Sequence, residues 1–211
     1  MTLERLHEAR AVAVVRARDG EEALHIVDAL ANAGLRAIEL TFTTPGVAAA
    51  IAEARSRLDD DTLLGAGTIT TAAEAEAAAA AGADFLVSPH LDPPLLERML
   101  ATGLLAIPGT LTPSEIGAAL RIGAPAVKLF PAATVGVPYL RALFGPFPDL
   151  QVMPTGGVTI ADARAWLDAG AVAVGLGGEL LPKALREAGD WDAITDNAAR
   201  LLAKLREEAT V

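Results

Sequence analysis

The feature that most constrains the fold is the even recurrence of short, apolar, non-alternating segments along the chain. Such segments are typical of strands that are buried on both faces of a parallel sheet. We expect strands at Ala11–Arg16, Ala37–Leu40, Thr62–Gly65, Phe85–Val87, Leu104–Ile107, Ala126–Leu129, Gln151–Pro154 and Ala171–Gly175. No Pro/Gly/Ser-rich linker divides them, so we expect an α/β protein with a single domain over residues 1–211.

Segments with helical periodicity separate these strands. Clear examples are Glu21–Ala33, Ala72–Ala81, Pro94–Ala101, Ser114–Ile122 and Ile160–Ala169, each closely followed by a glycine of the kind that ends helices. Eight strand–helix units of roughly 20–25 residues predict a single (β/α)8 TIM barrel of near-minimal size. An open doubly wound sheet is the main alternative, because strand order cannot be read from periodicity.

Two further helices are expected at the ends of the chain. Residues Glu4 to Arg10 predict an N-terminal helix that caps the bottom of the barrel. Residues Asp192 to Glu208 have the pattern of a final amphipathic helix.

Charge and composition exclude several classes of function. The formal net charge is −10, which has the wrong sign for non-specific binding to nucleic acid or to an anionic membrane surface. The chain has no cysteine, so it can form neither a disulfide nor a thiolate site. Neither a signal-peptide pattern nor a stretch of about twenty apolar residues is visible, and we expect a cytoplasmic protein.

Lys128 is one of only three lysines and lies within an apolar segment, Ala126–Pro131. A lysine flanked by strand-forming residues must reach solvent, pair with an acid or lose its proton. The neutral amine is a nucleophile that forms a Schiff base with a carbonyl group. The structural alternative is a paired lysine at the end of a strand.

Glu39 lies in a second apolar segment, Arg36–Leu40. Its structural alternative is a salt bridge to Arg16 or Lys128 that only supports the barrel. The functional interpretation is a general acid/base whose pKa is raised by burial. Active sites of such barrels lie at the carboxyl ends of the strands, so Lys128 and Glu39 would face one site as nucleophile and proton-transfer partner.

Two glycine turns follow the last two expected strands, Thr155-Gly156-Gly157 and Gly175-Leu176-Gly177-Gly178. Turns at these places in a barrel bind phosphate through backbone N–H groups. A carboxylate is the other anion that they would suit. No cluster of His, Asp and Glu has the spacing of a metal site, so we expect neither a metal nor another cofactor.

Several of these segments occur together in one order that resembles a known family. They are Ala13-Val14-Val15-Arg16, Ile38-Glu39-Leu40-Thr41, Gly65-Ala66-Gly67-Thr68, Val87-Ser88-Pro89, Val127-Lys128-Leu129-Phe130-Pro131 and Pro154-Thr155-Gly156-Gly157-Val158. The chain, from about Leu6 to Lys183, resembles the bacterial 2-keto-3-deoxy-6-phosphogluconate (KDPG) and 4-hydroxy-2-oxoglutarate (KHG) aldolases. The resemblance implies a metal-free class I lyase on a (β/α)8 barrel, usually a homotrimer, that forms pyruvate from a 2-oxo acid.

The resemblance also implies roles for individual residues. Lys128 matches the Schiff-base lysine and Glu39 the general acid/base. Thr68 matches a threonine that contacts pyruvate, and Pro89 and Phe130 match residues that line the pocket. The positions that match near the carboxylate or phosphate are an arginine and two glycine turns: Arg16, Thr155, Gly156, Gly157, Gly177 and Gly178.

The chain departs from the family pattern at two places. Thr43 stands where some members have a carboxylate-binding arginine, so we expect this task to pass to Arg16, Thr43 or backbone donors. In the last turn Gly178, followed by Glu179, replaces a serine that is common in the family, which predicts weaker phosphate binding by about 1–3 kcal/mol. The implied substrates therefore remain two, a phosphorylated sugar acid and 4-hydroxy-2-oxoglutarate.

Two other functions are compatible with the sequence. One is a phosphate-binding barrel isomerase or epimerase, in which Lys128 is an electrostatic group. The other is a catalytically silent barrel that serves as a scaffold. Both predict that Lys128 forms no covalent adduct with pyruvate.

Overall fold

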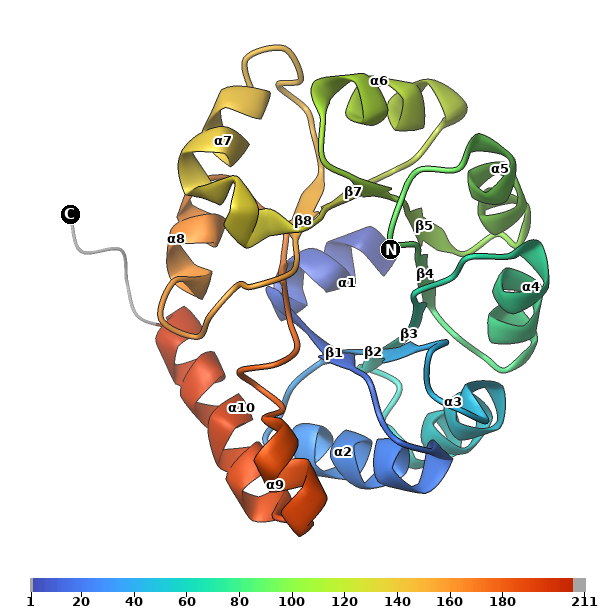
Figure 1. The fold of residues 1–211 in the computed structure, drawn as a ribbon, viewed down its shortest axis with the longest axis vertical. Coiled ribbons are helices and arrows are strands. Elements are labelled where there is room, and N and C mark those ends of the chain that lie inside the picture. The colour runs from blue at the N-terminus through green and yellow to red at the C-terminus, as the bar shows by residue number, and fades with distance from the viewer. Residues whose placement is uncertain (1, 207–211) are drawn as a thin grey trace.

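The computed structural model describes residues 2–206, which form an α/β fold with a curled parallel sheet and helices on its outside (Figure 1). Every strand pairing is parallel. The strands are β1 (Ala11–Val15), β2 (Ala37–Thr41), β3 (Leu63–Gly67), β4 (Phe85–Val87), β5 (Leu105–Ile107), β6 (Gly109–Thr110), β7 (Val127–Leu129), β8 (Val152–Pro154) and β9 (Val174–Leu176).

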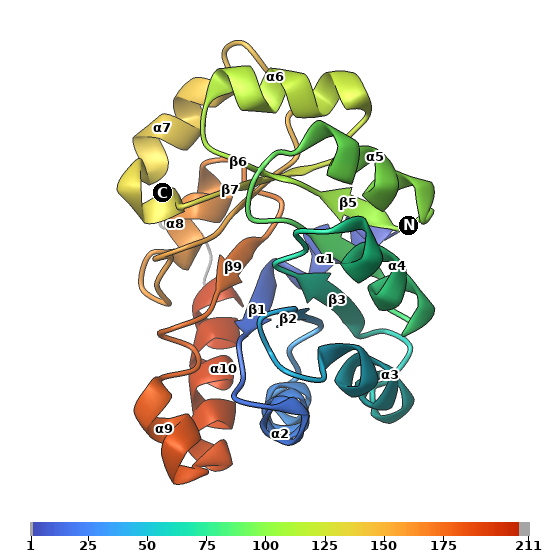
Figure 2. The same cartoon turned by 45° about the vertical axis from the view of Figure 1, so that its right-hand side comes forward.

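Helices connect successive strands except β5 and β6, and Figure 2 shows α4, α5 and α6 along the outer side of the sheet. The α-helices are α1 (Thr2–Ala9), α2 (Gly20–Asn32), α3 (Val47–Arg57), α4 (Ala72–Ala80), α5 (Pro93–Ala101), α6 (Pro113–Ile122), α7 (Gly136–Leu143), α8 (Ala163–Asp168), α9 (Lys183–Ala188) and α10 (Trp191–Arg206), and η1 (Ala132–Thr134) is a 3-10 helix. No helix within residues 2–206 has the length and apolar character needed to cross a lipid bilayer.

The strands form two sheets in the orders β5-β4-β3-β2-β1-β9 and β6-β7-β8. Only Pro108 separates β5 from β6, so one extended segment pairs with β4 first and with β7 later. On the other side, a bridge between Thr155 and Gly175 links the ends of β8 and β9. An N–H of Val172 also donates to the carbonyl of Val152, at 3.0 Å.

The buried apolar residues form two clusters, as a curled sheet with an outer layer of helices requires. The larger cluster lies between the strands and the helices. The smaller one joins residues from successive strands, among them Val12, Leu63, Phe85 and Met153, with Leu6 of α1. Figure 1 accordingly shows α1 behind the middle of the curled sheet.

Local sequence explains where several helices begin. Thr71 and Glu74 form a capping box at α4, and Thr112 and Glu115 form another at α6, so each side chain accepts a backbone N–H of the other residue. The Asp19 side chain caps α2 by accepting the N–H of Glu22 at 2.9 Å.

The expected elements are present, with corrections at their ends. Arg16 lies beyond β1, β3 extends to Gly67, and the last strand begins at Val174, not at Ala171. The helix expected over Ile160–Ala169 is shorter, because residues 159–162 form a hydrogen-bonded turn before α8. Helices α3 and α7 were not among the helical segments singled out from the sequence, and the expected end of the last helix at Glu208 lies outside the described residues.

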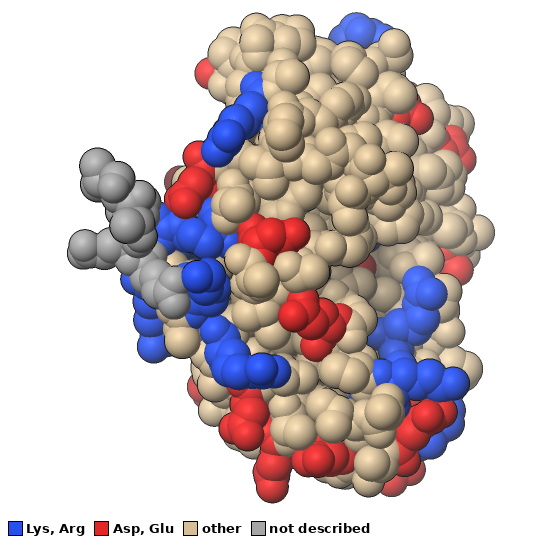
Figure 3. Space-filling view, turned by 60° about the vertical axis from the view of Figure 1, so that its left-hand side comes forward, with Lys and Arg blue, Asp and Glu red and all other residues tan. Residues whose placement is uncertain are grey.

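Surface charge is unevenly distributed. In Figure 3 the charged side chains gather over the lower half, and the upper part, where α6 and α7 lie, is mostly uncharged. The segment 131–148 contains a single charged residue, Arg141. Its exposed side chains include those of Pro138, Ala142 and Pro146.

Candidate active site

A cavity of about 180 Å3 lies at the carboxyl ends of the strands. The residues that line it come from the ends of β1, β3, β4, β7, β8 and β9: Val14, Arg16, Thr68, Pro89, Lys128, Phe130, Thr155, Gly156, Gly157, Gly177 and Gly178. The cavity therefore contains every expected site residue except Glu39 and Thr43. Sequence reasoning missed Val14, whose apolar side chain carries no chemical signal.

Lys128 occupies the middle of β7, where backbone pairing on both sides fixes its position. It lies opposite Gly109 of β6 and Met153 of β8, and its N–H donates to the carbonyl of Pro108 at 2.8 Å. Its residue is only 5% exposed, and Nζ lies 5.3 Å from the centre of the Phe130 ring. The amine thus reaches the cavity from a strand residue that is almost fully shielded from solvent.

Glu39 lies next to this amine, with Oε1 at 4.0 Å from Nζ of Lys128. The residue is fully buried, and neither carboxyl oxygen has a hydrogen-bond partner within residues 2–206. Burial raises the pKa of Glu39 above its ordinary value, and the nearby charges of Lys128 and Arg16 oppose this rise only in part. A carboxyl group with a raised pKa can both donate and accept a proton near neutrality.

Gly67 provides the space that the Glu39 side chain occupies. A Cβ atom at this position would overlap Oε1, Cδ and Cγ of Glu39. Gly67 pairs with Thr41 of β2, and its carbonyl accepts the N–H of Phe42 at 2.8 Å, so its backbone is fixed. Only glycine therefore fits here, a role that the sequence analysis did not assign.

Thr68 follows Gly67 in a backbone conformation that is rare for a branched residue, with a φ of 54°. The flanking hydrogen bonds hold this conformation, since the N–H of Ile69 donates to the carbonyl of Val87 at 3.0 Å. Conformations of this kind cost about 1–3 kcal/mol and cluster at functional sites. The strained turn presents Thr68 to the cavity.

Arg16 and Thr43, the two alternatives for carboxylate binding, lie in different places. Arg16 is exposed at the rim of the cavity and forms no hydrogen bond or ion pair with another described residue. Thr43 is exposed outside the cavity, with Oγ1 at 2.9 Å from Oγ1 of Thr41. The geometry thus brings Arg16 to the site and leaves the role of Thr43 a prediction.

The two glycine turns face the same cavity from β8 and β9. Gly156 and Gly157 have φ angles of 91° and 78°, which favour glycine. A Cβ at Gly156 would press against the Phe130 ring, and one at Gly157 would overlap the Ala133 side chain. The backbone of this turn thereby comes close to the cavity, as binding of an anion by backbone N–H groups requires.

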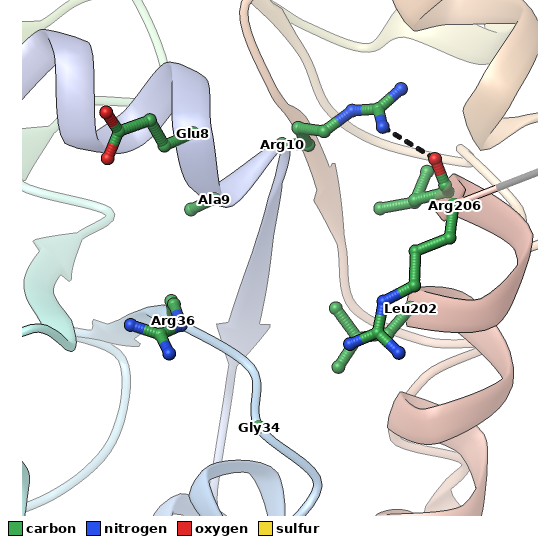
Figure 4. A pocket seen from close by; sticks show the side chains of 8 residues that line it. Glu8, Ala9, Arg10, Gly34, Arg36, Leu202 and Arg206 are labelled. Carbon is green, nitrogen blue, oxygen red and sulfur yellow. Dashed lines mark hydrogen bonds between the residues drawn. The ribbon is translucent and has the colours of Figure 1, made fainter.

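A second cavity, of about 170 Å3, lies at the opposite end of the strands, and Figure 4 shows the side chains that line it. Arg10 points from the start of β1 to the end of α10 there, and its Nη1 donates to the carbonyl of Leu205 at 2.6 Å. A cation at a helix C-terminus is stabilising. We assign these contacts to stability, because ligands of parallel α/β folds bind at the carboxyl ends of the strands and not at this end.

No group of three or more His, Cys, Asp or Glu residues within residues 2–206 could hold a metal ion.

Comparison with known proteins places the chain among aldolases. The family model described as KDPG and KHG aldolase matches residues 3–197. The 2-dehydro-3-deoxy-phosphogluconate aldolase of Haemophilus influenzae is 36% identical over 193 residues, which are 91% of each chain. The KHG/KDPG aldolase of Escherichia coli K12 is 35% identical, over 87% of this chain and 86% of its own.

A solved structure extends this similarity to three dimensions. It is the KDPG aldolase of Legionella pneumophila with pyruvate captured at low pH as a covalent carbinolamine intermediate. The two folds agree with a TM-score of 0.88 at 29% identity, over 95% of this chain and 98% of that one. Together with the family model, these relatives show that the chain belongs to the KDPG and KHG aldolase family.

Proposed function

We propose that the protein is a class I, metal-independent aldolase that cleaves a 2-oxo-4-hydroxy acid to pyruvate and an aldehyde. One observation carries the proposal: a nearly buried lysine in the cavity, Lys128, with the buried carboxyl group of Glu39 at 4.0 Å. Schiff-base chemistry requires a nucleophilic amine and an adjacent group that transfers protons. The substrates are 2-dehydro-3-deoxy-6-phosphogluconate, which gives glyceraldehyde 3-phosphate, and 4-hydroxy-2-oxoglutarate, which gives glyoxylate.

Lys128 supplies the electron sink. Its neutral ε-amine attacks the C2 ketone and forms a carbinolamine, which loses water to give an iminium ion. When the C3–C4 bond breaks, its electron pair moves to C3 and neutralises the iminium, so an enamine of pyruvate remains on the lysine. Protonation at C3 and hydrolysis then release pyruvate and restore the amine.

Glu39 moves the protons in these steps. The separation of 4.0 Å from Nζ exceeds a direct hydrogen bond, so a substrate atom or a water lies between the two groups during transfer. As a carboxylate, Glu39 accepts the C4 hydroxyl proton while C4 becomes the aldehyde. As a carboxylic acid, it returns a proton to C3 of the enamine. The raised pKa suits a group that must do both.

The remaining residues of the cavity orient the substrate. Arg16 at the rim is a permanent cation for a carboxylate or phosphate group. Thr68 contacts the pyruvate part, and Pro89 and Phe130 line the wall beside Lys128. The Thr155-Gly156-Gly157 and Gly177-Gly178 turns receive the anionic end through their backbone.

We further propose that the sheet closes into an eight-stranded (β/α)8 barrel, with β5 and β6 as one strand and α1 across its bottom, and that residues 1–211 are one domain. The bridge between Thr155 and Gly175 and the burial of Leu6 among strand residues support this arrangement.

A homotrimer in the cytoplasm is the assembly and location that we propose. The mostly uncharged surface of residues 131–148 supports self-association, because interface cores are depleted of charged residues.

Coupled detection of released pyruvate tests the activity. Both substrates are offered with and without a strong metal chelator, and a metal-dependent aldolase serves as the control for chelation. We expect pyruvate release that the chelator leaves unchanged. Loss of activity that only a divalent metal restores would contradict the class I mechanism.

A further inference from the structure

Glu179 joins the two loops that border the far end of the active-site cavity. It follows Gly178, and its Oε2 accepts the N–H of Ile160 at 2.8 Å. Ile160 belongs to the loop that continues from Gly157, so the bond connects the loop after β8 with the loop after β9. The side chain is exposed, and no lysine or arginine within residues 2–206 forms an ion pair with it. Its negative charge is therefore not neutralised.

The cavity extends beyond the glycine turns into a space of about 300 Å3, lined by Val14, Arg16, Gly177, Gly178, Leu181 and Arg186. A substrate bound at Lys128 that is too long for the first cavity would extend into this space, because the two share four lining residues. Its two cations differ in availability. Arg186 donates from Nη1 to Oε1 of buried Glu22 at 3.1 Å and from Nε to the carbonyl of Leu181 at 3.3 Å.

The charge of Arg186 is thus compensated by Glu22, and Arg16 is the cation that remains available in this described lining. A phosphoryl dianion at the far end would meet one available cation, and the uncompensated negative charge of Glu179 would lie next to Gly178 of the lining. It would also lose one backbone donor, because the N–H of Ile160 is already bound. Hydroxyl groups at the same place would suffer neither penalty, since they carry no charge.

We propose that Glu179 is a specificity-determining residue that acts against a phosphoryl group, and that the preferred substrate class is the unphosphorylated 2-oxo-3-deoxy-4-hydroxy acids with hydroxyl groups at the far end. This inference rests on the proposed aldolase function and concerns the same cavity. Glu179 acts through its charge on the far end of the substrate and takes no part in the steps at C2, C3 and C4.

Glu179→Gln separates charge from structure, because the amide oxygen of glutamine still accepts the N–H of Ile160. The matched control is Glu53→Gln, which removes one negative charge from the exposed ion pair with Arg57 on α3. For each protein, kcat/KM is measured for 2-dehydro-3-deoxy-6-phosphogluconate and for its unphosphorylated counterpart. The readout is the ratio of the two values, which cancels changes common to both substrates.

We expect the wild-type protein to cleave the unphosphorylated acid at least as efficiently as the phosphorylated one. Glu179→Gln should raise the ratio in favour of the phosphorylated acid by about tenfold, the order of magnitude for a unit charge that acts on a nearby dianion in a nearly aqueous dielectric. Glu53→Gln should leave the ratio unchanged.

Three results would overturn the proposal: a wild-type preference for the phosphorylated acid, an unchanged ratio in Glu179→Gln, or the same change in Glu53→Gln. Failure of the aldolase function itself is distinguishable. In that case the wild-type protein would release no pyruvate from the phosphorylated acid, from its unphosphorylated counterpart or from 4-hydroxy-2-oxoglutarate.

Discussion

Gly67→Ala is a small change that should disable the site without replacing a reacting group. The new Cβ would overlap three atoms of the Glu39 side chain, including Oε1. The backbone of Gly67 is held by its pairing with Thr41 and by the N–H of Phe42, so the Glu39 carboxyl group must move instead. The residue is fully buried, so its displacement must be accommodated among packed neighbours.

The expected loss follows from this forced displacement. A misplacement of about 1 Å costs roughly 10²-fold in rate, and the whole contribution of a general acid/base is about 10²–10⁴-fold. We therefore expect kcat to fall by about 10²- to 10³-fold. Overpacking of this kind also costs about 1–3 kcal/mol in the free energy of unfolding, which leaves the protein folded at room temperature.

Steady-state pyruvate release and urea unfolding measure the two effects separately. Gly20→Ala, at the start of α2, is the matched control. The new Cβ would lie at an ordinary 3.6 Å from Cβ of Ala50. The control should retain the wild-type kcat. A Gly67→Ala protein with wild-type kcat would refute the reasoning, since it would show that the position of the Glu39 carboxyl group does not limit the reaction.

Two further predictions concern the buried pair. Lys128→Ala should abolish pyruvate release from both substrates in protein shown to be folded by circular dichroism, and residual turnover near the wild-type level would remove the lysine from the mechanism. Glu39→Gln should gain stability relative to the wild type as the pH rises from about 4.5, because a pKa raised by burial makes ionisation of Glu39 unfavourable in the folded state. Below this pH both proteins carry a neutral side chain, so a stability difference in urea that stays constant from about pH 4 to 8 would contradict the burial effect.

Much of the fold could be predicted because its signals are local. The five glycines expected after helices, Gly34, Gly82, Gly103, Gly123 and Gly170, all have positive φ angles. Apolar segments marked the strands because both faces of this sheet are buried. The short helix α7 was not singled out because its segment begins with Gly136 and includes Pro138, residue types that are unfavourable in helices.

The candidate site was predictable where the reaction requires a residue type that is unusual in its sequence context. Lys128 and Glu39 are conspicuous because ionisable residues within apolar segments are costly unless they have a partner or a task. Gly67 was not assigned, because its role depends on a side chain from a strand that lies 28 residues earlier (67 − 39) and becomes its neighbour only in the sheet. The contact between Glu179 and Ile160 likewise joins two loops whose distance no local pattern encodes.

The most direct test of the mechanism is trapping of the covalent intermediate. The protein is incubated with pyruvate, borohydride is added, and the peptides are mapped by mass spectrometry. We predict a stable pyruvate adduct on Lys128 and none on Lys183 or Lys204, which lie on α9 and α10. Absence of an adduct on Lys128 in folded protein would contradict the Schiff-base mechanism and favour the isomerase or the silent barrel.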